Sequence, residues 1–271
     1  MMSTQTEQVG FLQVDSLKIE IYPDKASAGH AAAARAAAAL REQPATGDIG
    51  VIFATGASQI ATLQALTHIP NLPWSRILGF HMDEYENMRP EHPASFRGYL
   101  RERLTSKVSM KEFNEIDGTV ADLEQVCAHY AEKLRAASPK LCLLGIGENG
   151  HLAFNDPPVA NFEDPKDMKI VELDAECRQQ QLAEGWFKSL DDIPRRALTL
   201  TIPALFRVPR LIASVPGPRK AHSVYRSLTE PISTACPATL LRAHPDCTVY
   251  LDQDSATELK GMSVRWSHNE P

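Results

Sequence analysis

The sequence has no long apolar run, no basic stripe and no signal-peptide pattern, and each absence excludes a class of protein. No apolar run approaches the roughly 20 residues that cross a bilayer, so we expect no membrane partner. The net charge is −6 and charges of both signs are mixed, which argues against a nucleic-acid partner. The N-terminus lacks a basic segment followed by an apolar one, so we expect a cytoplasmic protein.

Cysteine is scarce as well. The chain has five cysteines, an odd number, and none of them forms a CxxC pair. This pattern argues against a disulfide framework and a structural zinc site, so we expect reduced thiols and no metal. Cys142 lies inside an apolar run and is expected to be a small core residue.

The sequence shows neither an internal repeat nor a linker. Its 271 residues, 43% of them hydrophobic, are enough to bury a substantial core. Residues 1–10 are polar and are expected to form a flexible tail, followed by one domain over residues 11–271.

Short apolar segments alternate with helical patterns along the chain. Helices are expected at 26–43, 58–68, 95–106, 121–137 and 218–230, and strands at 17–23, 76–85 and 140–146. Residues 48–58 are expected to form a strand that runs into a glycine turn, residues 195–217 a strand, a short turn or helix and another strand, and residues 247–259 a strand and a short helix. This alternation predicts an α/β fold, Rossmann-like, with a doubly wound, mostly parallel sheet covered by helices on both faces. In such a fold, ligands gather at the carboxyl ends of the strands.

Three expected strand ends carry groups suited to chemistry. Thr55, Gly56, Ala57 and Ser58 form a glycine turn before a helix, where free backbone N–H groups can bind an anion. The equally plausible alternative is a simple helix cap. Asp83 and Glu84 end the 76–85 segment, and one of them can point into the crevice as a base. Taken alone, a solvated strand end is the commoner explanation.

The segment GIGENGHLAFND (145–156) is the third of these strand ends. His151 can move protons near neutral pH, and Asn149 or Asp156 can hold its ring in one tautomer. A merely structural loop histidine is the alternative, but the density of polar groups after a buried strand favours function. Arg219 and Lys220 start a later helix, where cations oppose the dipole, so they either meet an anion or are surface charges.

Three segments together resemble the glucosamine-6-phosphate deaminase/isomerase family, which is related to 6-phosphogluconolactonase. They are VIFATGASQIATLQAL, ILGFHMDEYENM and LCLLGIGENGHLAFNDP, and the likeness covers roughly residues 25–260. The resemblance implies conversion of glucosamine 6-phosphate and water to fructose 6-phosphate and ammonia, with no cofactor. It implies that Asp83 shuttles a proton between C2 and C1. His151, assisted by Asp156 and Asn149, would open the sugar ring.

The resemblance also implies how the sugar phosphate is bound. The turn at 55–58, Glu84, Gly150 and Lys220 fall at its binding positions. A family arginine that meets phosphate falls near Glu184 here, and Arg178 or Arg219 could replace it. Two further departures concern the histidine: Asp156 stands where the family typically has glutamate, and Asn149 where many members have aspartate. Asp156 is shorter by one methylene, which leaves its reach to His151 open.

Several alternatives stay open at this stage. The substrate could be galactosamine 6-phosphate or another sugar phosphate. A 6-phosphogluconolactonase usually reads GHTASLFP, so GHLAFNDP favours the deaminase. A non-catalytic sugar-phosphate sensor could dispense with Asp83 and His151, yet both are present. A homo-oligomer is possible; the sequence fixes neither the oligomeric state, nor the physiological direction, nor allosteric activation.

Overall fold

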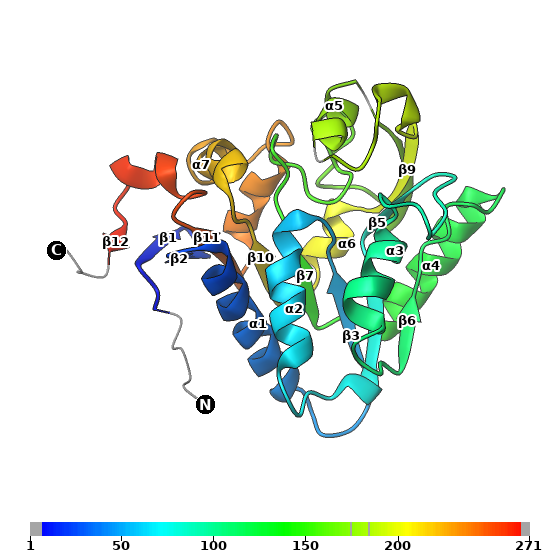
Figure 1. Cartoon of the computed structure of the whole chain (residues 1–271), viewed down its shortest axis with the longest axis horizontal. Coiled ribbons are helices and arrows are strands. Elements are labelled where there is room, and N and C mark those ends of the chain that lie inside the picture. The colour runs from blue at the N-terminus through cyan, green and yellow to red at the C-terminus, as the bar shows by residue number, and fades with distance from the viewer. Residues whose placement is uncertain (1–6, 174, 184, 267–271) are drawn as a thin grey trace.

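A nine-stranded sheet forms the centre of the computed structural model, which describes residues 7–173, 175–183 and 185–266 (Figure 1). The strand order is β12-β1-β2-β11-β10-β7-β3-β4-β6. The strands are β1 (Gly10–Val14), β2 (Leu17–Tyr22), β3 (Ile49–Phe53), β4 (Ile77–His81), β6 (Glu112–Asn114), β7 (Leu141–Leu144), β10 (Leu211–Ser214), β11 (Cys247–Asp252) and β12 (Arg265–Trp266). In this spatial order, every adjacent pair of strands between β2 and the edge strand β6 is parallel. β1 pairs antiparallel with β2 and with β12. The predicted mostly parallel sheet is confirmed.

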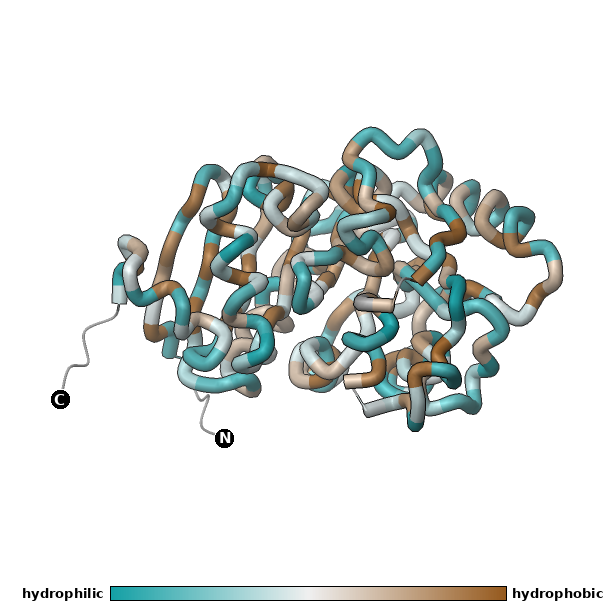
Figure 2. The backbone as a smooth tube through the Cα atoms, turned by 90° about the horizontal axis from the view of Figure 1, so that it is seen from above, coloured by the Kyte–Doolittle hydropathy of each residue, from teal (hydrophilic) through white to brown (hydrophobic). Residues whose placement is uncertain are grey.

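Helices cover both faces of this sheet because its central strands are apolar on both sides. Along β3, Val51 and Phe53 pack with α1 (Lys25–Arg41) and α2 (Ile60–His68), whereas Ile52 packs on the opposite face. That opposite face is covered by α4 (Leu123–Ala137), α6 (Ile202–Phe206) and α7 (Ala221–Thr229). Figure 2 shows that much of the outer rim of the molecule is hydrophilic. Burial on both faces explains the continuous apolar strand segments of the sequence.

The alanine-rich segment forms α1, as predicted. Asp24 caps the helix by accepting a hydrogen bond from the Ser27 amide at 2.8 Å. The small side chains let α1 lie close to its neighbours: a Cβ atom added to Gly29 would lie 2.5 Å from the Cβ atom of Ala61 in α2. Close packing therefore requires glycine at position 29 despite its low helix propensity, whereas the alanines of α1 are favoured by helix propensity as well.

A second, three-stranded antiparallel sheet corrects the expectation of a single strand over 76–85. The chain leaves the large sheet after β4, turns at the buried Met82 and continues as β5 (Asp83–Tyr85). β5 pairs with β9 (Arg196–Leu200), which pairs with β8 (Met168–Glu172). The break is held by a 2.7 Å hydrogen bond from the Leu200 amide to the Met82 carbonyl. α5 (Ala175–Ala183) follows β8 on this side of the molecule (Figure 1).

Two other predicted boundaries differ in the structure. The helix expected at 95–106 consists of α3 (Phe96–Leu100) and a π-helical turn over Arg101–Thr105, with Ser95 as the predicted N-cap. Gly10, expected in the tail, is the first residue of β1 and lies under the Trp266 ring. Residues 1–6 of the predicted tail lie outside the described part. Within that part, every helix is too short or too polar to cross a membrane.

The order of the strands determines where a crevice can form. From β3 the chain proceeds outward to β4 and β6, and then returns to the other side of β3 to form β7, β10 and β11. The direction of winding therefore reverses between β3 and β7. Ligand sites of doubly wound sheets lie at the carboxyl ends of the strands beside such a reversal.

Candidate active site

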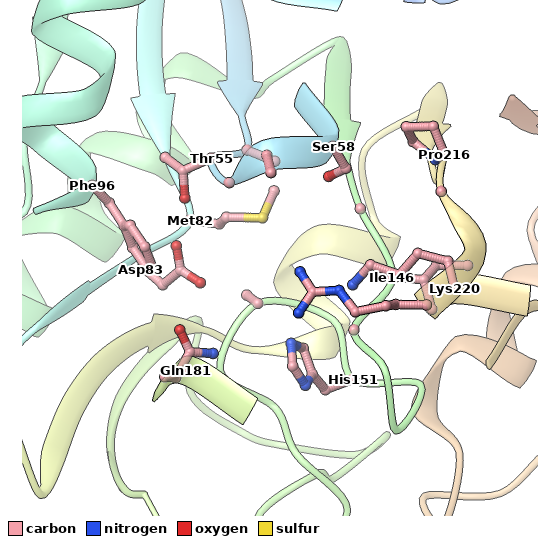
Figure 3. Close-up of a pocket in the computed structure, with 18 of the residues that line it drawn as sticks. Thr55, Ser58, Met82, Asp83, Phe96, Ile146, His151, Gln181, Pro216 and Lys220 are labelled. Carbon is pink, nitrogen blue, oxygen red and sulfur yellow. The ribbon is translucent and has the colours of Figure 1, made fainter. Parts of the chain in front are cut away.

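A pocket of about 300 Å³ opens at this reversal, beyond the carboxyl ends of β3, β7 and β10 (Figure 3). The three predicted strand ends all contribute to it. The predicted residues that line it are Thr55, Gly56, Ala57, Ser58, Asp83, His151, Arg219 and Lys220. In Figure 3, Asp83 and Lys220 lie on opposite sides of the pocket, with His151 below them.

Two oxygen atoms hold the imidazole of His151. Its Nδ1 atom lies 2.9 Å from Oδ1 of Asp156 and 2.9 Å from Oδ1 of Asn149. Two acceptors on one side of the ring assign the proton to Nδ1, which leaves Nε2 as the atom that can exchange a proton with a ligand. Asp156 therefore reaches His151 despite being shorter than the glutamate typical of the resemblance.

Asn149 contributes both of its polar groups to this arrangement. Its Oδ1 atom accepts from the backbone amide of His151 at 3.1 Å, and its Nδ2 atom donates to Oδ1 of Asp156 at 2.9 Å. A carboxylate at position 149 could not make the second contact, because it has no proton to donate and would repel Asp156. Asparagine at 149 is thus chemically matched to a closely placed aspartate at 156.

Asp156 is a buried carboxylate whose charge is nevertheless favoured. Burial by itself raises the pKa of its carboxyl, but the charge of His151 and hydrogen bonds from His151, Asn149 and Cys177 outweigh burial and lower the pKa to about 2. The group is therefore ionised throughout the physiological range. It can stabilise a proton on His151 during a transfer.

Glycine is needed at two points of this loop. A Cβ atom at Gly147 would lie 2.3 Å from atoms of the His151 ring, so the ring occupies the space of a side chain there. Gly150 has φ 89°, and a Cβ atom there would lie 2.4 Å from Sγ of Cys236. Gly150 does not line the pocket, in contrast to its predicted binding role. Its contribution is to the shape of the loop.

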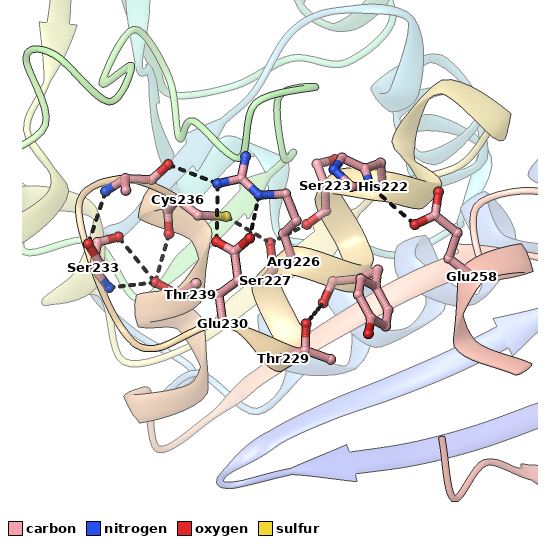
Figure 4. A network of polar contacts seen from close by, with 12 residues as sticks. His222, Ser223, Arg226, Ser227, Thr229, Glu230, Ser233, Cys236, Thr239 and Glu258 are labelled. Atoms are coloured by element: carbon pink, nitrogen blue, oxygen red, sulfur yellow. Dashed lines mark hydrogen bonds and ion pairs between the residues drawn. The ribbon is translucent and has the colours of Figure 1, made fainter. Parts of the chain in front are cut away.

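The loop is supported from behind by the segment that follows α7. The Gly150 carbonyl accepts from the Ala238 amide at 2.8 Å. Cys236, which packs against Gly150, lies among polar groups of α7 and the next turn, including Ser227 and Thr239 (Figure 4). These contacts hold the loop that carries His151 in place against the segment after α7.

Asp83 and Glu84 have different environments although they are adjacent. Asp83 is 6% exposed and lines the pocket. Glu84 is fully buried and accepts hydrogen bonds from the Ser95 hydroxyl and from the amides of Phe96 and Arg97 at 2.9–3.2 Å. Glu84 joins the start of α3 to β5 and does not line the pocket.

Two glycine turns with similar geometry converge on the other side of the pocket. Gly56 follows β3 with φ 92°, and Gly217 follows β10 with φ 99°. Each is succeeded by one 3₁₀ turn and then by a helix, α2 or α7. Two helix N-termini, with their partly unsatisfied N–H groups, are therefore directed at one region, which suits a multiply charged anion.

Basic side chains surround the same region. Lys25, Arg219 and Lys220 line the pocket. Arg219 also donates to the Ala183 carbonyl at 3.2 Å and lies 3.4 Å from a carboxylate oxygen of Glu148. Arg178, the other predicted candidate, lies outside the pocket lining and donates to the Leu190 carbonyl.

Some lining residues were not anticipated from the sequence, namely Lys25, Met82, Phe96 and Gln181. Lys25 is the first residue of α1 and lies three positions after the end of β2, a parallel strand, so the rule applied to the other strand ends could have found it. Gln181, on α5, accepts from the Tyr85 hydroxyl at 2.6 Å, and only the folded chain shows that it lies at the pocket.

Glu184, near which the absent arginine was expected, lies outside the described residues. Among those that are described, no cluster of three or more His, Cys, Asp or Glu residues could hold a metal ion.

Comparisons with known proteins agree with this geometry. A family model described as glucosamine-6-phosphate isomerases/6-phosphogluconolactonase matches residues 23–250. Glucosamine-6-phosphate deaminases of Bacillus thuringiensis, Bacillus cereus and Bacillus anthracis are each 34% identical over 215 residues, or 79% of this chain and 78% of theirs. The structure of a monomeric glucosamine-6-phosphate deaminase has a TM-score of 0.81 at 28% identity, covering 89% of this chain and 99% of that one.

More distant structures share the fold alone. The 6-phosphogluconolactonase of Thermotoga maritima has a TM-score of 0.70 at 19% identity, covering 88% of this chain and 100% of that one. The chain belongs to the glucosamine-6-phosphate isomerase/6-phosphogluconolactonase family.

Proposed function

We propose that this member of the family is an amino-sugar-phosphate deaminase that converts glucosamine 6-phosphate and water to fructose 6-phosphate and ammonia. One observation carries the proposal: a single pocket holds the oriented imidazole of His151 and the carboxylate of Asp83, beside two turns suited to a phosphate. The relatives at 34% identity are glucosamine-6-phosphate deaminases, which supports the same choice.

The first chemical step is opening of the sugar ring. The imidazole of His151 takes the proton of the C1 hydroxyl through Nε2 and delivers it to the ring oxygen, so the C1–O5 bond breaks and an aldehyde forms. Asp156 and Asn149 hold the opposite side of the ring at 2.9 Å, so the imidazolium formed in between is stabilised without moving.

The second step is isomerisation. The C2 proton becomes acidic once C1 is an aldehyde. Asp83 removes it to give a C1–C2 enolamine and returns it to C1, while one proton passes from the amino group to O1. The resulting C2 imine adds water and releases ammonia, leaving the ketose phosphate. Two proton-transfer groups are needed because the ring oxygen and the C1–C2 bond lie at different places on the substrate.

The phosphate takes no part in bond changes and serves to orient the sugar. The turns at Gly56 and Gly217, together with Lys25 and Lys220, offer hydrogen-bond donors and positive charge to it. Binding energy from this remote group holds C1, C2 and O5 against the reacting side chains. Arg219 is available to the same anion if it leaves Glu148.

A substrate panel tests the proposal. Ammonia and ketose 6-phosphate would be measured with glucosamine 6-phosphate and galactosamine 6-phosphate, and lactone hydrolysis with 6-phosphogluconolactone. We expect ammonia from glucosamine 6-phosphate, with activity on the C4 epimer defining the specificity. Hydrolysis of the lactone alone would replace the proposal with the lactonase reaction. Binding of all three without turnover would indicate a sensor.

A further inference from the structure

The second carboxylate oxygen of Asp156 has a partner from a different part of the chain. Its Oδ2 atom lies 3.2 Å from Sγ of Cys177, which is on α5 and 1% exposed. This sulfur contact is short, since those of Cys142 and Cys236 measure 3.8 Å. An ionised carboxylate can only accept, so the Cys177 thiol is the donor.

The two carboxylate oxygens of Asp156 thus accept hydrogen bonds from different donors. Oδ1 receives Nδ1 of His151 and Nδ2 of Asn149, each at 2.9 Å, and Oδ2 receives the thiol of Cys177. A carboxylate held through one oxygen can still rotate about its terminal torsion, which has a broad minimum. A donor on the second oxygen removes that freedom and fixes the direction in which Oδ1 faces His151.

The helix that carries Cys177 also reaches the substrate side of the pocket. Gln181, one turn further along α5, lines the pocket and accepts from the Tyr85 hydroxyl at 2.6 Å. Phe154, on the loop between His151 and Asp156, packs in the same apolar cluster as Cys177 and Tyr85. α5 therefore joins the lining of the pocket to the group behind the imidazole.

We infer that Cys177 is a positioning residue for ring opening: its thiol orients Asp156, and through it His151. This rests on the proposed deaminase function. Loss of the donor leaves Asp156 mobile and its charge less neutralised. Ring opening then slows, because the hydrogen bond from Nδ1 of His151 to Oδ1 of Asp156 is no longer held in its direction.

Three variants separate the hydrogen bond from packing. Cys177→Ser keeps a donor on a smaller side chain, Cys177→Ala has the same loss of volume without a donor, and Cys177→Val fills the space without a donor. We expect Ala and Val to lower kcat on glucosamine 6-phosphate about tenfold with KM nearly unchanged, the lower end of the range found for partners behind metal-bound side chains. The Ser variant should stay within about twofold of the wild type.

The NMR signal of the Nδ1 proton of His151, recorded at one pH, gives a readout that needs no substrate. The signal would be assigned by its absence in His151→Gln. The chemical shift of this proton follows the strength of its hydrogen bond to Asp156. We expect the signal to move upfield in the Ala and Val variants, and to stay near the wild-type position in the Ser variant.

The outcomes are separable. Equal chemical shifts of the His151 Nδ1 proton and equal kcat in all four proteins would overturn the role of Cys177. So would an equal loss of kcat in the Ser and Ala variants without a change of that chemical shift, because that result indicates packing alone. Absence of deamination in the wild type would instead refute the proposed function, and the NMR signal would still decide whether Cys177 orients the Asp156–His151 pair.

Discussion

Replacement of Asp83 by asparagine removes the proposed base that transfers the proton between C2 and C1 and leaves the other groups of the site in place. Asparagine has the same shape, and Asp83 joins β5 to β9 through its backbone, paired with Thr199, so the strand pairing does not depend on the carboxylate. An amide cannot remove the C2 proton. A positioned general base contributes about 10²–10⁴-fold, so we expect kcat to fall by that factor, or about 3–5 kcal/mol in the barrier.

Binding should respond very differently. The anion-binding turns at Gly56 and Gly217 belong to other strands of the sheet, so the Kd of a non-reacting sugar phosphate, measured by calorimetry, should change less than about threefold. Glu84→Gln is the matched control, because it changes the neighbouring carboxylate, which holds the start of α3. That variant should lose thermal stability and keep kcat in its folded fraction. Full turnover in Asp83→Asn would refute the assignment of the base.

Three other predictions follow from the surroundings of the imidazole. His151→Gln should slow the cyclic substrate more than an open-chain analogue in steady-state assays, and equal losses on both would contradict a ring-opening role. Gly147→Ala should abolish most activity while the protein stays folded by circular dichroism, because its methyl group would need the space of the His151 ring, 2.3 Å away; normal activity would contradict this packing. Burial and its partners leave the pKa of Asp156 at about 2, below the ordinary 3.8, so its ionisation stabilises the fold above pH 4 and this contribution is lost as pH falls toward 2. Urea unfolding at pH 5 and near pH 2 should therefore show Asp156→Asn losing about 2 kcal/mol less than the wild type over that interval, and parallel losses would refute the depressed pKa.

The parallel sheet was predictable because its strands are short, apolar on both faces and separated by helices. The same rule located three of the strand ends that form the pocket. The rule failed at 76–85, where the chain leaves the large sheet after His81 and continues in the small sheet as β5. Met82 is buried at the junction, and nothing in its neighbours marks a turn.

The individual roles of the polar residues were less predictable. Asp83 and Glu84 are both acidic and adjacent, and only the folded chain distinguishes the one that lines the pocket from the one that accepts hydrogen bonds from the first amides of α3. The contact of Cys177 with Asp156 joins residues 21 positions apart through α5. No local pattern encodes such a contact, since it depends on how α5 packs over the loop.

The most direct test of the account is a time course with glucosamine 6-phosphate carrying deuterium at C2, in which ammonia and ketose 6-phosphate are measured together. The account predicts equal amounts of the two products and a slower rate than with the protiated sugar, because Asp83 breaks the C2–H bond. Ammonia without the ketose, or neither product while the sugar phosphate binds, would contradict it.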